Sequence, residues 1–375
     1  MSIVTDPSVG PSATLRALDA TVADSYRFVV GVDTHAAEHV YGLIGCPHGL
    51  ALDLPQEFPT TQAGIDRAIR WLGRRTGGDI TATLVVVEGT GSYGAILASR
   101  LADLGYRVVE APTPARNRGQ AKNDALDAAA VAQLALRIPT TRLRDRRGAG
   151  PDTATHEALQ VLLTAREQDN DERTRAINAL TALVRTHQLG IDARRALTRT
   201  QITQIAHWRP RSEHAGLATA RTRAVRLAKQ ILLLAKDLAA NQQQLHDLVT
   251  TRAPELLALP GVGPVTAAVV LTAWSHPGRV RNEAAFAAIA GTSPIEASSG
   301  NRHELRLNRG GDRRLNSAIT TIAMTRMRCD ERTRTYTQRR RTEGLTTRRI
   351  RRCLKRYITR ELYRTLNTIH REPGA

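Results

Sequence analysis

Several features are missing from this chain of 375 residues, and each absence excludes a class of protein. Cysteine occurs only at Cys46, Cys329 and Cys353, an odd number without metal-ligand spacing, which fits a reducing cytoplasm and argues against a zinc site. No apolar run reaches the ~18 residues that a membrane-spanning helix requires. Residues 1–25 lack the basic and apolar segments of a signal peptide and predict a flexible N-terminus. We therefore expect a cytoplasmic protein outside the membrane.

Aromatic residues make up only 3% of the chain, so stacking platforms for unpaired bases are scarce. The chain has positive charge in excess. Its net charge is +19 and its pI is near 11.0, which predicts a polyanionic partner. Lysine occurs only four times, so nearly all of this charge is arginine, a bias that a GC-rich genome would explain in part.

The arginines are concentrated towards the C-terminus. Residues 331–375 carry 14 Arg and Lys against 4 Glu and no Asp, which is about half of the whole excess in an eighth of the chain. A genome-wide base composition does not explain this clustering. Because guanidinium groups make bidentate phosphate contacts that lysine cannot make, we expect nucleic acid to be bound through phosphates, backbone amides and arginine side chains.

The length and the order of sequence patterns predict several domains. Residues 26–150 show an early run of strands and then alternating helices and strands, a pattern typical of the ribonuclease-H-like (RuvC-like) α/β fold. Residues 151–255 predict a charged helical arm, and residues 256–370 predict a second, helical domain. We expect strands at 28–32, 39–45, 50–58, 84–87 and 106–110 and helices at 61–75 and 92–104.

Four acidic residues occupy positions suited to metal binding. Asp33 and Glu88 each end an apolar run typical of a buried strand. Asp124 and Asp127 lie three residues apart at the start of an expected helix, a spacing that places both on one helical face. Carboxylate oxygens suit Mg²⁺, and two such ions about 4 Å apart stabilise the attacking and leaving oxygens of a phosphodiester. The sequence therefore predicts a two-metal site.

Each of these acids alone has a simpler explanation. An Asp after a strand often caps a helix or forms a turn. Two acids near a helix start can merely complement the helix dipole. The four acids together, in strand–strand–helix order within one domain-sized segment, favour the metal site.

Leucine and isoleucine follow a heptad pattern in the second half of the helical arm. Asn241 occupies one core position, where a polar residue fixes the register of a coiled coil. An antiparallel hairpin within one chain and a zipper between two chains both fit this pattern. The apolar positions are Leu227, Ile231, Leu234, Leu238, Leu245 and Leu248.

The second helical domain opens with the segment L-P-G-V-G at residues 259–263, which resembles the turn of a helix-hairpin-helix. Gly261 and Gly263 would let the backbone approach DNA closely, and amides at the start of the next helix would bind a phosphate. An ordinary turn between helices uses the same residues, so both interpretations stay open.

A loop of small residues follows at positions 291–302, and a basic segment follows at 309–315. Serines in such a loop usually form turns. Because no His or Lys is tied to them by spacing, chemistry alone gives Ser299 little support as a nucleophile. The candidate contacts to nucleic acid in this region are Arg302, Arg309, Arg313 and Arg314.

The order of these motifs resembles the DEDD-type insertion-sequence transposases (insertion-sequence family one-hundred-ten), a group that includes Piv-like DNA invertases. The matching segments are V-G-V-D-T ending at Thr34, E-G-T-G-S-Y beginning at Glu88, K-N-D-A-L-D-A around Asp124, L-P-G-V-G, and A-G-T-S-P leading to Ser299. The resemblance covers roughly residues 27–365. One departure is Asn316, which stands where an arginine is common.

The resemblance implies a RuvC-like domain with a metal-binding acidic tetrad: Asp33, Glu88, Asp124 and Asp127. The tetrad would bind two Mg²⁺ or Mn²⁺ ions. It also implies a C-terminal transposase domain in which a serine becomes joined to a DNA phosphate. Ser299 is favoured over Ser298 because it precedes a glycine and follows Pro294 by five positions.

Some members of this group are guided by a structured bridge RNA that pairs with donor and target DNA. The implied partners are therefore DNA, a bridge RNA and further copies of the chain in a dimer or tetramer, in the nucleoid of a bacterial cytoplasm. We expect a site-specific recombinase that mobilises an insertion element, as a transposase or an invertase. The alternatives are a RuvC-like junction nuclease, in which water attacks, and a non-enzymatic nucleic-acid-binding protein.

Overall fold

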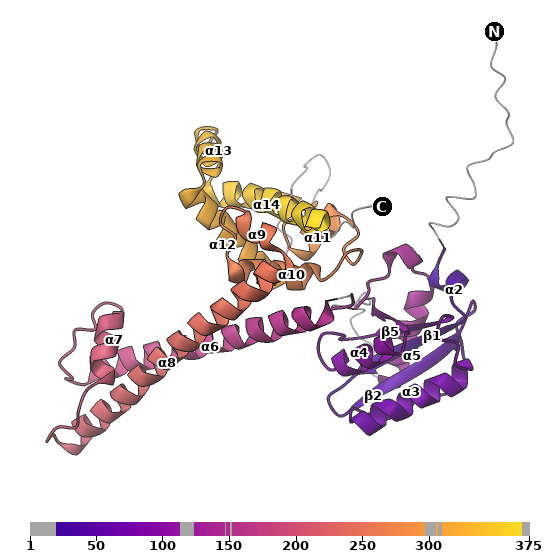
Figure 1. The fold of residues 1–375 in the computed structure, drawn as a ribbon, viewed down its shortest axis with the longest axis horizontal. Helices are drawn as coiled ribbons and strands as arrows, with labels where there is room; N and C mark the ends of the chain where they lie inside the picture. The colour runs from indigo at the N-terminus through magenta and orange to yellow at the C-terminus, as the bar shows by residue number, and fades with distance from the viewer. Residues whose placement is uncertain are drawn as a thin grey trace, which may run out of the picture. The chain divides into compact units, whose positions relative to one another are not determined.

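The computed structural model describes residues 20–112, 124–146, 148–150, 152–296, 305–306 and 310–369. The chain divides into two compact units (Figure 1): residues 1–151 with 278–281, and residues 152–277 with 282–375. Each unit has hydrophobic clusters of its own. No helix in the described part of the chain is both long enough and apolar enough to cross a membrane.

A mixed sheet of six strands forms the centre of the first unit. The central strand β1 (Phe28–Thr34) is antiparallel to β2 (Glu38–Gly45) and parallel to β5 (Thr83–Val87), and β5 is parallel to β6 (Arg107–Glu110). Two short strands, β3 (Leu50–Ala51) and β4 (Gln56–Pro59), pair with successive parts of β2. The prediction of an α/β first domain is therefore confirmed.

The single strand expected over residues 50–58 is instead two short strands. Between them, the Asp53 carboxylate accepts hydrogen bonds from Trp71 Nε1 at 3.2 Å and Arg75 Nε at 2.8 Å. Pro55 follows, and it has no N–H to donate to a strand ladder. The chain therefore leaves the edge of β2 and returns to it further along.

Helices cover both faces of this sheet, which explains why its central strands are apolar on both sides. α3 (Gln62–Thr76) and α4 (Ala95–Asp103) share a cluster with Val30 and Val32 of β1. α2 (Val22–Ser25) and α5 (Asp124–Leu136) share another cluster with Val29. Successive β1 residues thus pack into two different cores.

Two long helices of the second unit lie side by side (Figure 1): α6 (Thr153–Thr186) and α8 (Ala215–Arg252). They run antiparallel, because Leu162 is bonded to Asn241 while Glu172 is bonded to Gln230. The short α7 (Arg199–Ala206) packs with both helices in one cluster. Of the two arrangements that the heptad pattern allowed, the described chain shows the hairpin within one chain.

Asn241 is buried in this helix pair and its polar atoms are bonded across it. Its Nδ2 donates to the Leu162 carbonyl at 2.9 Å, and Arg166 Nη1 donates to its Oδ1 at 3.4 Å and to the Leu238 carbonyl at 3.1 Å. Burial lowers the pKa of Arg166. These bonds can form only in one alignment of α6 with α8, so Asn241 sets the register of the pair.

The rest of the second unit is a helical bundle around α10. This helix is buried on every side from Ala267 to Trp274. α14 belongs to the core as well, because Ile350, Leu354 and Leu362 are buried. The basic C-terminal segment is therefore part of the bundle rather than an appendage. The elements are α9 (Pro254–Ala258), α10 (Pro264–Trp274), α11 (Glu283–Ile289), β7 (Ile295–Glu296), β8 (Leu305–Arg306), α12 (Arg313–Cys329), α13 (Glu331–Thr342) and α14 (Thr347–Ile369).

Candidate active site and nucleic-acid contacts

Asp33 and Glu88 lie next to each other at the carboxyl ends of two adjacent parallel strands. The register pairs Val32 of β1 with Val87 of β5, so the residue that follows each one carries a carboxylate. The Glu88 amide donates to the Val32 carbonyl at 3.0 Å, and Thr34 Oγ1 donates to the Glu88 carbonyl at 2.8 Å. Strand pairing thus places these two predicted ligands at one edge of the sheet.

Two of the glycines after Glu88, Gly89 and Gly94, are required by the tight turn that joins β5 to α4. Gly89 has φ +66°, and a Cβ there would lie 2.8 Å from Ser92 Oγ. A Cβ on Gly94 would lie 2.8 Å from Val87 Cγ1. Gly89 of the E-G-T-G-S-Y motif and the following Gly94 therefore hold the chain close to the end of β5, while Glu88 stays exposed.

The Asp33 side chain is largely buried and has a histidine beside it. Only 7% of Asp33 is exposed, and His35 Nε2 lies 3.1 Å from its Oδ2. A histidine nitrogen at this distance orients a carboxylate, much as outer partners orient metal ligands. His35 was not predicted as a site residue, although its position two residues after Asp33 is visible in the sequence.

α5 brings Asp124 and Asp127 towards the same edge. A Cβ on Gly31 would lie 2.0 Å from the Ala128 carbonyl oxygen, so α5 rests directly on β1. At the other end of α5, Leu136 lies against Gly49. Gly49 follows Gly45, the residue of β2 that pairs with Phe28 at the start of β1. α5 therefore runs opposite to β1, and its first turn lies at the end of the strand that carries Asp33. The side chains of residues 124–127 lie outside the described residues.

A further acid stands at this edge and was not singled out from the sequence. Glu110 ends β6 and pairs with Val87, one strand beyond Glu88. Its Oε1 lies 3.5 Å from Thr90 Oγ1 and accepts a bond from Arg279 Nη2 at 2.9 Å. Arg279 belongs to the short segment 278–281 of this unit. Glu110 also ends a strand, which is the signal that could have identified it.

The donors at this edge are oxygen atoms, as Mg²⁺ and Mn²⁺ require. In the described part of the chain, no group of three His, Cys, Asp or Glu residues comes close enough to hold a metal. Asp33 and Glu88 are thus two described members of the predicted tetrad. The other two members belong to the first turn of α5.

In the second unit, the L-P-G-V-G segment connects α9 to α10 and packs on α12. Gly261 has φ +73°, and a Cβ there would lie 3.1 Å from the Ile322 carbonyl oxygen. Arg326 Nε donates to the Pro260 carbonyl at 2.6 Å, and the Gly263 amide donates to Thr266 Oγ1 at 3.0 Å. These contacts give the turn a structural role. Contacts of Gly261 and Gly263 with DNA stay a prediction.

The loop with the candidate serine is entered and left through a pair of short strands. β7 and β8 are antiparallel, with Ile295 opposite Arg306. Ser298, Ser299 and Arg302 fall in residues 297–304 between them, outside the described residues, as does Arg309. The described structure thus fixes the two ends of this loop.

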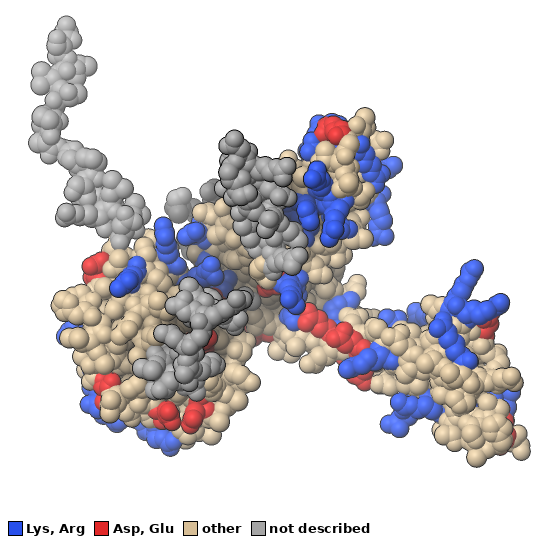
Figure 2. All heavy atoms as spheres, turned by 180° about the vertical axis from the view of Figure 1, so that it is seen from behind, with Lys and Arg blue, Asp and Glu red and all other residues tan. Residues whose placement is uncertain are grey.

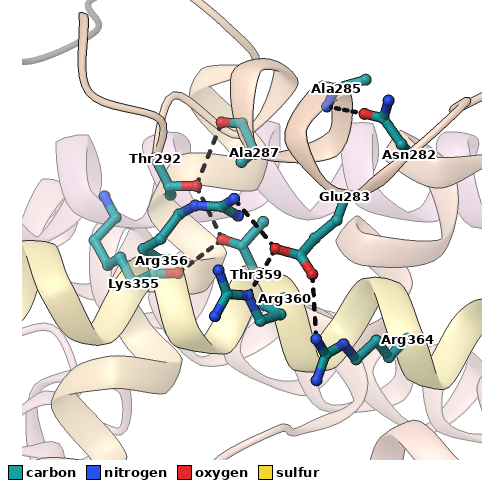
Figure 3. A network of polar contacts seen from close by, with 10 residues as sticks. All are labelled: Asn282, Glu283, Ala285, Ala287, Thr292, Lys355, Arg356, Thr359, Arg360 and Arg364. Atoms are coloured by element: carbon teal, nitrogen blue, oxygen red, sulfur yellow. Dashed lines mark hydrogen bonds and ion pairs between the residues drawn. The ribbon is translucent and has the colours of Figure 1, made fainter.

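Bonds from three helices hold the turn before β7, as Figure 3 shows in part. The Thr292 amide donates to the Ala287 carbonyl at 2.9 Å, and Thr292 Oγ1 lies 3.1 Å from Thr359 Oγ1 of α14. Asn316 Nδ2 donates to the Ala290 carbonyl at 2.6 Å, and Lys355 Nζ donates to Asn316 Oδ1 at 2.7 Å. Burial, followed by the charge of Arg351, lowers the pKa of Lys355.

Lys355 could not have been tied to the serine loop by spacing, because α14 lies far along the chain from it. The structure also gives a reason for Asn316, which stands where an arginine is common. An amide can accept from Lys355 and donate to the Ala290 carbonyl at once, whereas arginine has no acceptor.

The two described arginines at the start of α12 differ in their surroundings. Arg313 is exposed, whereas Arg314 is half-buried and ion-paired with Glu167 of α6. Figure 2 shows Lys and Arg over much of the visible surface around α13, with little acidic surface there. Binding of nucleic acid by Arg313 and Arg314 stays a prediction.

Comparisons with known proteins identify transposase families for segments of both units. Residues 30–188 match the transposase family DEDD_Tnp_IS110, and residues 253–338 match the family described as Transposase IS116/IS110/IS902. The chain is 27% identical to the "Insertion element IS110 uncharacterized 43.6 kDa protein" of Streptomyces coelicolor, over 84% of this chain and 88% of that protein. It is also 27% identical to the "Insertion element IS900 uncharacterized 42 kDa protein" of Mycobacterium paratuberculosis, over 72% of this chain and 78% of the relative.

The two family matches follow one another in the order in which the sheet domain and the helical bundle occur. The first contains Asp33, Glu88 and the start of α5, and the second contains the L-P-G-V-G turn and the serine loop. With relatives aligned over most of both chains, these matches show that the chain belongs to the IS110 family of DEDD transposases, enzymes that transfer phosphoryl groups on DNA.

Proposed function

We propose that this transposase mobilises an insertion element by site-specific recombination, cleaving and rejoining DNA at a site made of an acidic tetrad and a serine. One observation carries the proposal: Asp33 and Glu88 lie at adjoining strand ends, and the first turn of α5 lies towards the same edge. Three segments far apart in the sequence thus approach one edge of the sheet, which supports the proposed tetrad. Family membership favours an enzyme over the non-enzymatic alternative.

The acidic tetrad would hold two Mg²⁺ or Mn²⁺ ions through Asp33, Glu88, Asp124 and Asp127. Bound there, the ions would stabilise the negative charge that develops on the phosphate and lower the pKa of the attacking hydroxyl. The burial of Asp33 and its contact with His35 would fix one carboxylate in advance. A preorganised ligand loses less conformational entropy when the metal binds.

Ser299 would supply the attacking oxygen. Its Oγ would bond to a DNA phosphorus while the bond from that phosphorus to one bridging DNA oxygen breaks, and the departing oxygen takes up a proton. Attack by a DNA hydroxyl on the phosphoserine would then restore a phosphodiester and the serine hydroxyl. The number of phosphoester bonds is conserved, so rejoining needs no ATP.

Two observations support Ser299 as the nucleophile. The family pattern places a serine before a glycine, five residues after a proline, and Ser299 fits this register in the sequence. The two ends of its loop are held by β7 and β8, next to a turn bonded to α12 and α14. Lys355 lies beside that turn and is a candidate for contacting the phosphate.

DNA is the substrate of a transposase, and we propose a bridge RNA as its guide, with the protein acting as a dimer or tetramer. The net charge of +19 supports binding of two polyanions at once. Invertases and transposases of this group share the motifs quoted above, so a mobilising reaction is distinguished from inversion by the DNA products.

Trapping of a covalent intermediate tests the serine. Wild-type protein with Mg²⁺, donor DNA and target DNA should give a protease-sensitive adduct on DNA when the reaction is stalled. Ser299→Ala and Asp33→Asn should both abolish the adduct, and Ser298→Ala should retain it.

The outcomes separate the mechanisms. An adduct that survives Ser299→Ala but not Ser298→Ala would move the nucleophile by one residue. Cleavage without an adduct under every condition would favour attack by water, as in the junction-nuclease alternative. The bridge RNA is tested separately by adding or omitting the transcribed non-coding segment beside the coding region, with recombination lost on its omission.

A further inference from the structure

Three helices of the second unit, α12, α13 and α14, line a solvent-open cavity of about 430 Å³, and none of its lining residues belongs to the proposed active site. This volume lies in the range of pockets that hold small organic ligands, which is ~300–1,000 Å³. Its most distinctive lining residues are four arginines and two methionines: Arg328, Arg334, Arg341, Arg351, Met324 and Met327.

None of the described residues that line the cavity carries a carboxylate. Arg334 is paired with Glu331 at 3.2 Å, in a contact where both side chains are more than half exposed. Among the described residues, Arg328, Arg341 and Arg351 form no ion pair. Several like charges around one cavity repel each other unless an anion joins them, so the cavity is suited to an anionic ligand.

Several arginines of the same helices that lie outside the cavity are paired with acids. Glu283 accepts from Arg360 at 2.7 Å and also contacts Arg356 at 3.1 Å and Arg364 at 3.6 Å, as Figure 3 shows. Glu361 contacts Arg326 at 2.6 Å. Glu283 and Glu361 therefore pair with arginines outside the cavity, whereas Glu331 pairs with Arg334 of its lining.

The methionines add a second property to the cavity. The chain has only three methionines, and the two that follow Met1 both line it. They lie three residues apart on one face of α12, and Met324 is 48% exposed. A thioether is apolar and polarizable and makes favourable contacts with aromatic rings. In a chain with 3% aromatic residues, this pair is a surface on which a flat ring can rest.

We propose that this cavity binds one unpaired nucleotide of a nucleic-acid strand, with the base against Met324 and Met327 and the flanking phosphates on Arg328, Arg341 and Arg351. A free phosphate would leave the methionine surface and most of the volume unfilled. A continuous duplex would keep its bases stacked and out of reach. The ligand is therefore a loop, bulge or single-stranded end, and the lining residues of the cavity are different from the residues proposed for catalysis.

The methionines provide a direct reporter for this proposal. Full-length protein labelled with ¹³C in the methionine methyl groups should show three methyl signals, and Met324→Leu and Met327→Leu assign two of them. A short single-stranded oligonucleotide, added without divalent metal, should shift the Met324 and Met327 signals through the ring current of a base and leave Met1 unchanged. Because metal is absent, this result is independent of the active-site proposal.

The probes distinguish the sources of the ligand. Single-stranded RNA, single-stranded DNA and a hairpin with a bulge should all shift the signals, whereas a blunt duplex of equal length and inorganic phosphate should not. Unchanged Met324 and Met327 signals at a saturating concentration of every single-stranded probe would overturn the proposal. Equal shifts with a poly-glutamate peptide would overturn it in favour of an acidic protein partner.

Paired substitutions test the arginines. Arg341→Gln with Arg351→Gln should weaken binding of the single strand by about a hundredfold, since each of the two lost charge-assisted bonds costs about tenfold. It should also lower the slope of log affinity against log salt by about 1.4, or roughly 0.7 per phosphate contact. Arg332→Gln with Arg352→Gln is the matched control, because these exposed arginines lie on the same helices outside the cavity lining. Equal losses in the two double variants would mean general attraction to charge and would overturn the site.

Discussion

The two units place their functional groups by different means. In the sheet domain, backbone pairing decides the positions: the register of β1 with β5 sets Asp33 beside Glu88. In the helical bundle, side-chain bonds between distant segments decide them: Asn316 links Lys355 to the Ala290 carbonyl. A site built on strand register tolerates changes of neighbouring side chains but not of backbone spacing. A site built on side-chain bonds should show the reverse.

The largest effect is expected where the backbone of the sheet domain is closest to a helix. Gly31→Ala would put a Cβ 2.0 Å from the Ala128 carbonyl oxygen, so α5 would have to move and take Asp124 and Asp127 with it. We expect a loss of about 3 kcal/mol or more in unfolding free energy, with loss of DNA cleavage. Urea unfolding and a cleavage assay measure both.

Gly73→Ala is the matched control. A Cβ at Gly73, within α3, meets nothing within 4 Å. Alanine there should stabilise the domain by about 0.5–1 kcal/mol, because a helix interior favours it over glycine. If both variants unfolded alike, close packing of α5 on β1 would not be the feature that holds the edge together.

In the helical bundle, the next largest effect should come from one side chain. Arg326 is buried and bonded to the Pro260 carbonyl and to Glu361. Arg326→Ala should lower the unfolding free energy by about 2 kcal/mol, a value reduced for the partial exposure of Glu361. Arg332→Ala, an exposed change on the neighbouring helix, should change it by less than about 0.5 kcal/mol. Equal values from chemical unfolding would contradict the assignment of bundle architecture to side-chain bonds.

The sequence predicted the sheet domain better than the bundle, for a physical reason. An apolar run that ends in an acid gives both the strand and the position of its carboxylate, so Asp33 and Glu88 could be paired in advance. The prediction of a single strand over residues 50–58 was wrong because Asp53 and Pro55 interrupt it. The interruption at Asp53 depends on its contacts with α3. The roles of Asn316 and Lys355 depend on helices that meet only in the folded chain. The hydrophobic seam of the arm was visible in the sequence, but the bonds of Asn241 and Gln230 across the helix pair are needed to distinguish the hairpin from a zipper.

A smaller effect, on metal affinity, is expected within the sheet domain, where two aspartate variants can be compared directly. Asp124→Asn should weaken Mg²⁺ or Mn²⁺ binding by about tenfold or more, because a neutral amide replaces a carboxylate ligand. Asp103→Asn, the same change at the far end of α4, should leave the affinity unchanged. Calorimetric titration of wild type and both variants measures this. Equal metal affinity in wild type and Asp124→Asn would remove Asp124 from the tetrad.

The smallest effect is expected in the pH dependence of the stability of the helical bundle. The hydrogen bond from Arg360, with the charges of Arg360, Arg356 and Arg364, lowers the pKa of Glu283 below its ordinary 4.5. A lowered pKa means that the stabilisation is complete above the ordinary value and is lost as the pH falls below it. The thermal unfolding temperature should therefore fall between pH 6 and pH 3, and Glu283→Gln should make this fall smaller. An identical pH profile for the variant would show that the contacts are too exposed to matter.

The helical arm leaves the bundle and returns to it at almost the same point, where Arg252 Nε contacts Asp152 Oδ2 at 2.6 Å. α6 and α8 therefore form a helical hairpin whose base does not depend on the length of the two helices. Removing seven residues from each helix would shorten the arm by about 10.5 Å and return both helices to nearly the same face. The distance from the base to the α7 end can thus change in steps while the rest of the unit stays as it is. The length of the arm is thus a dimension that paired deletions or insertions of seven residues in α6 and α8 should change independently of the bundle.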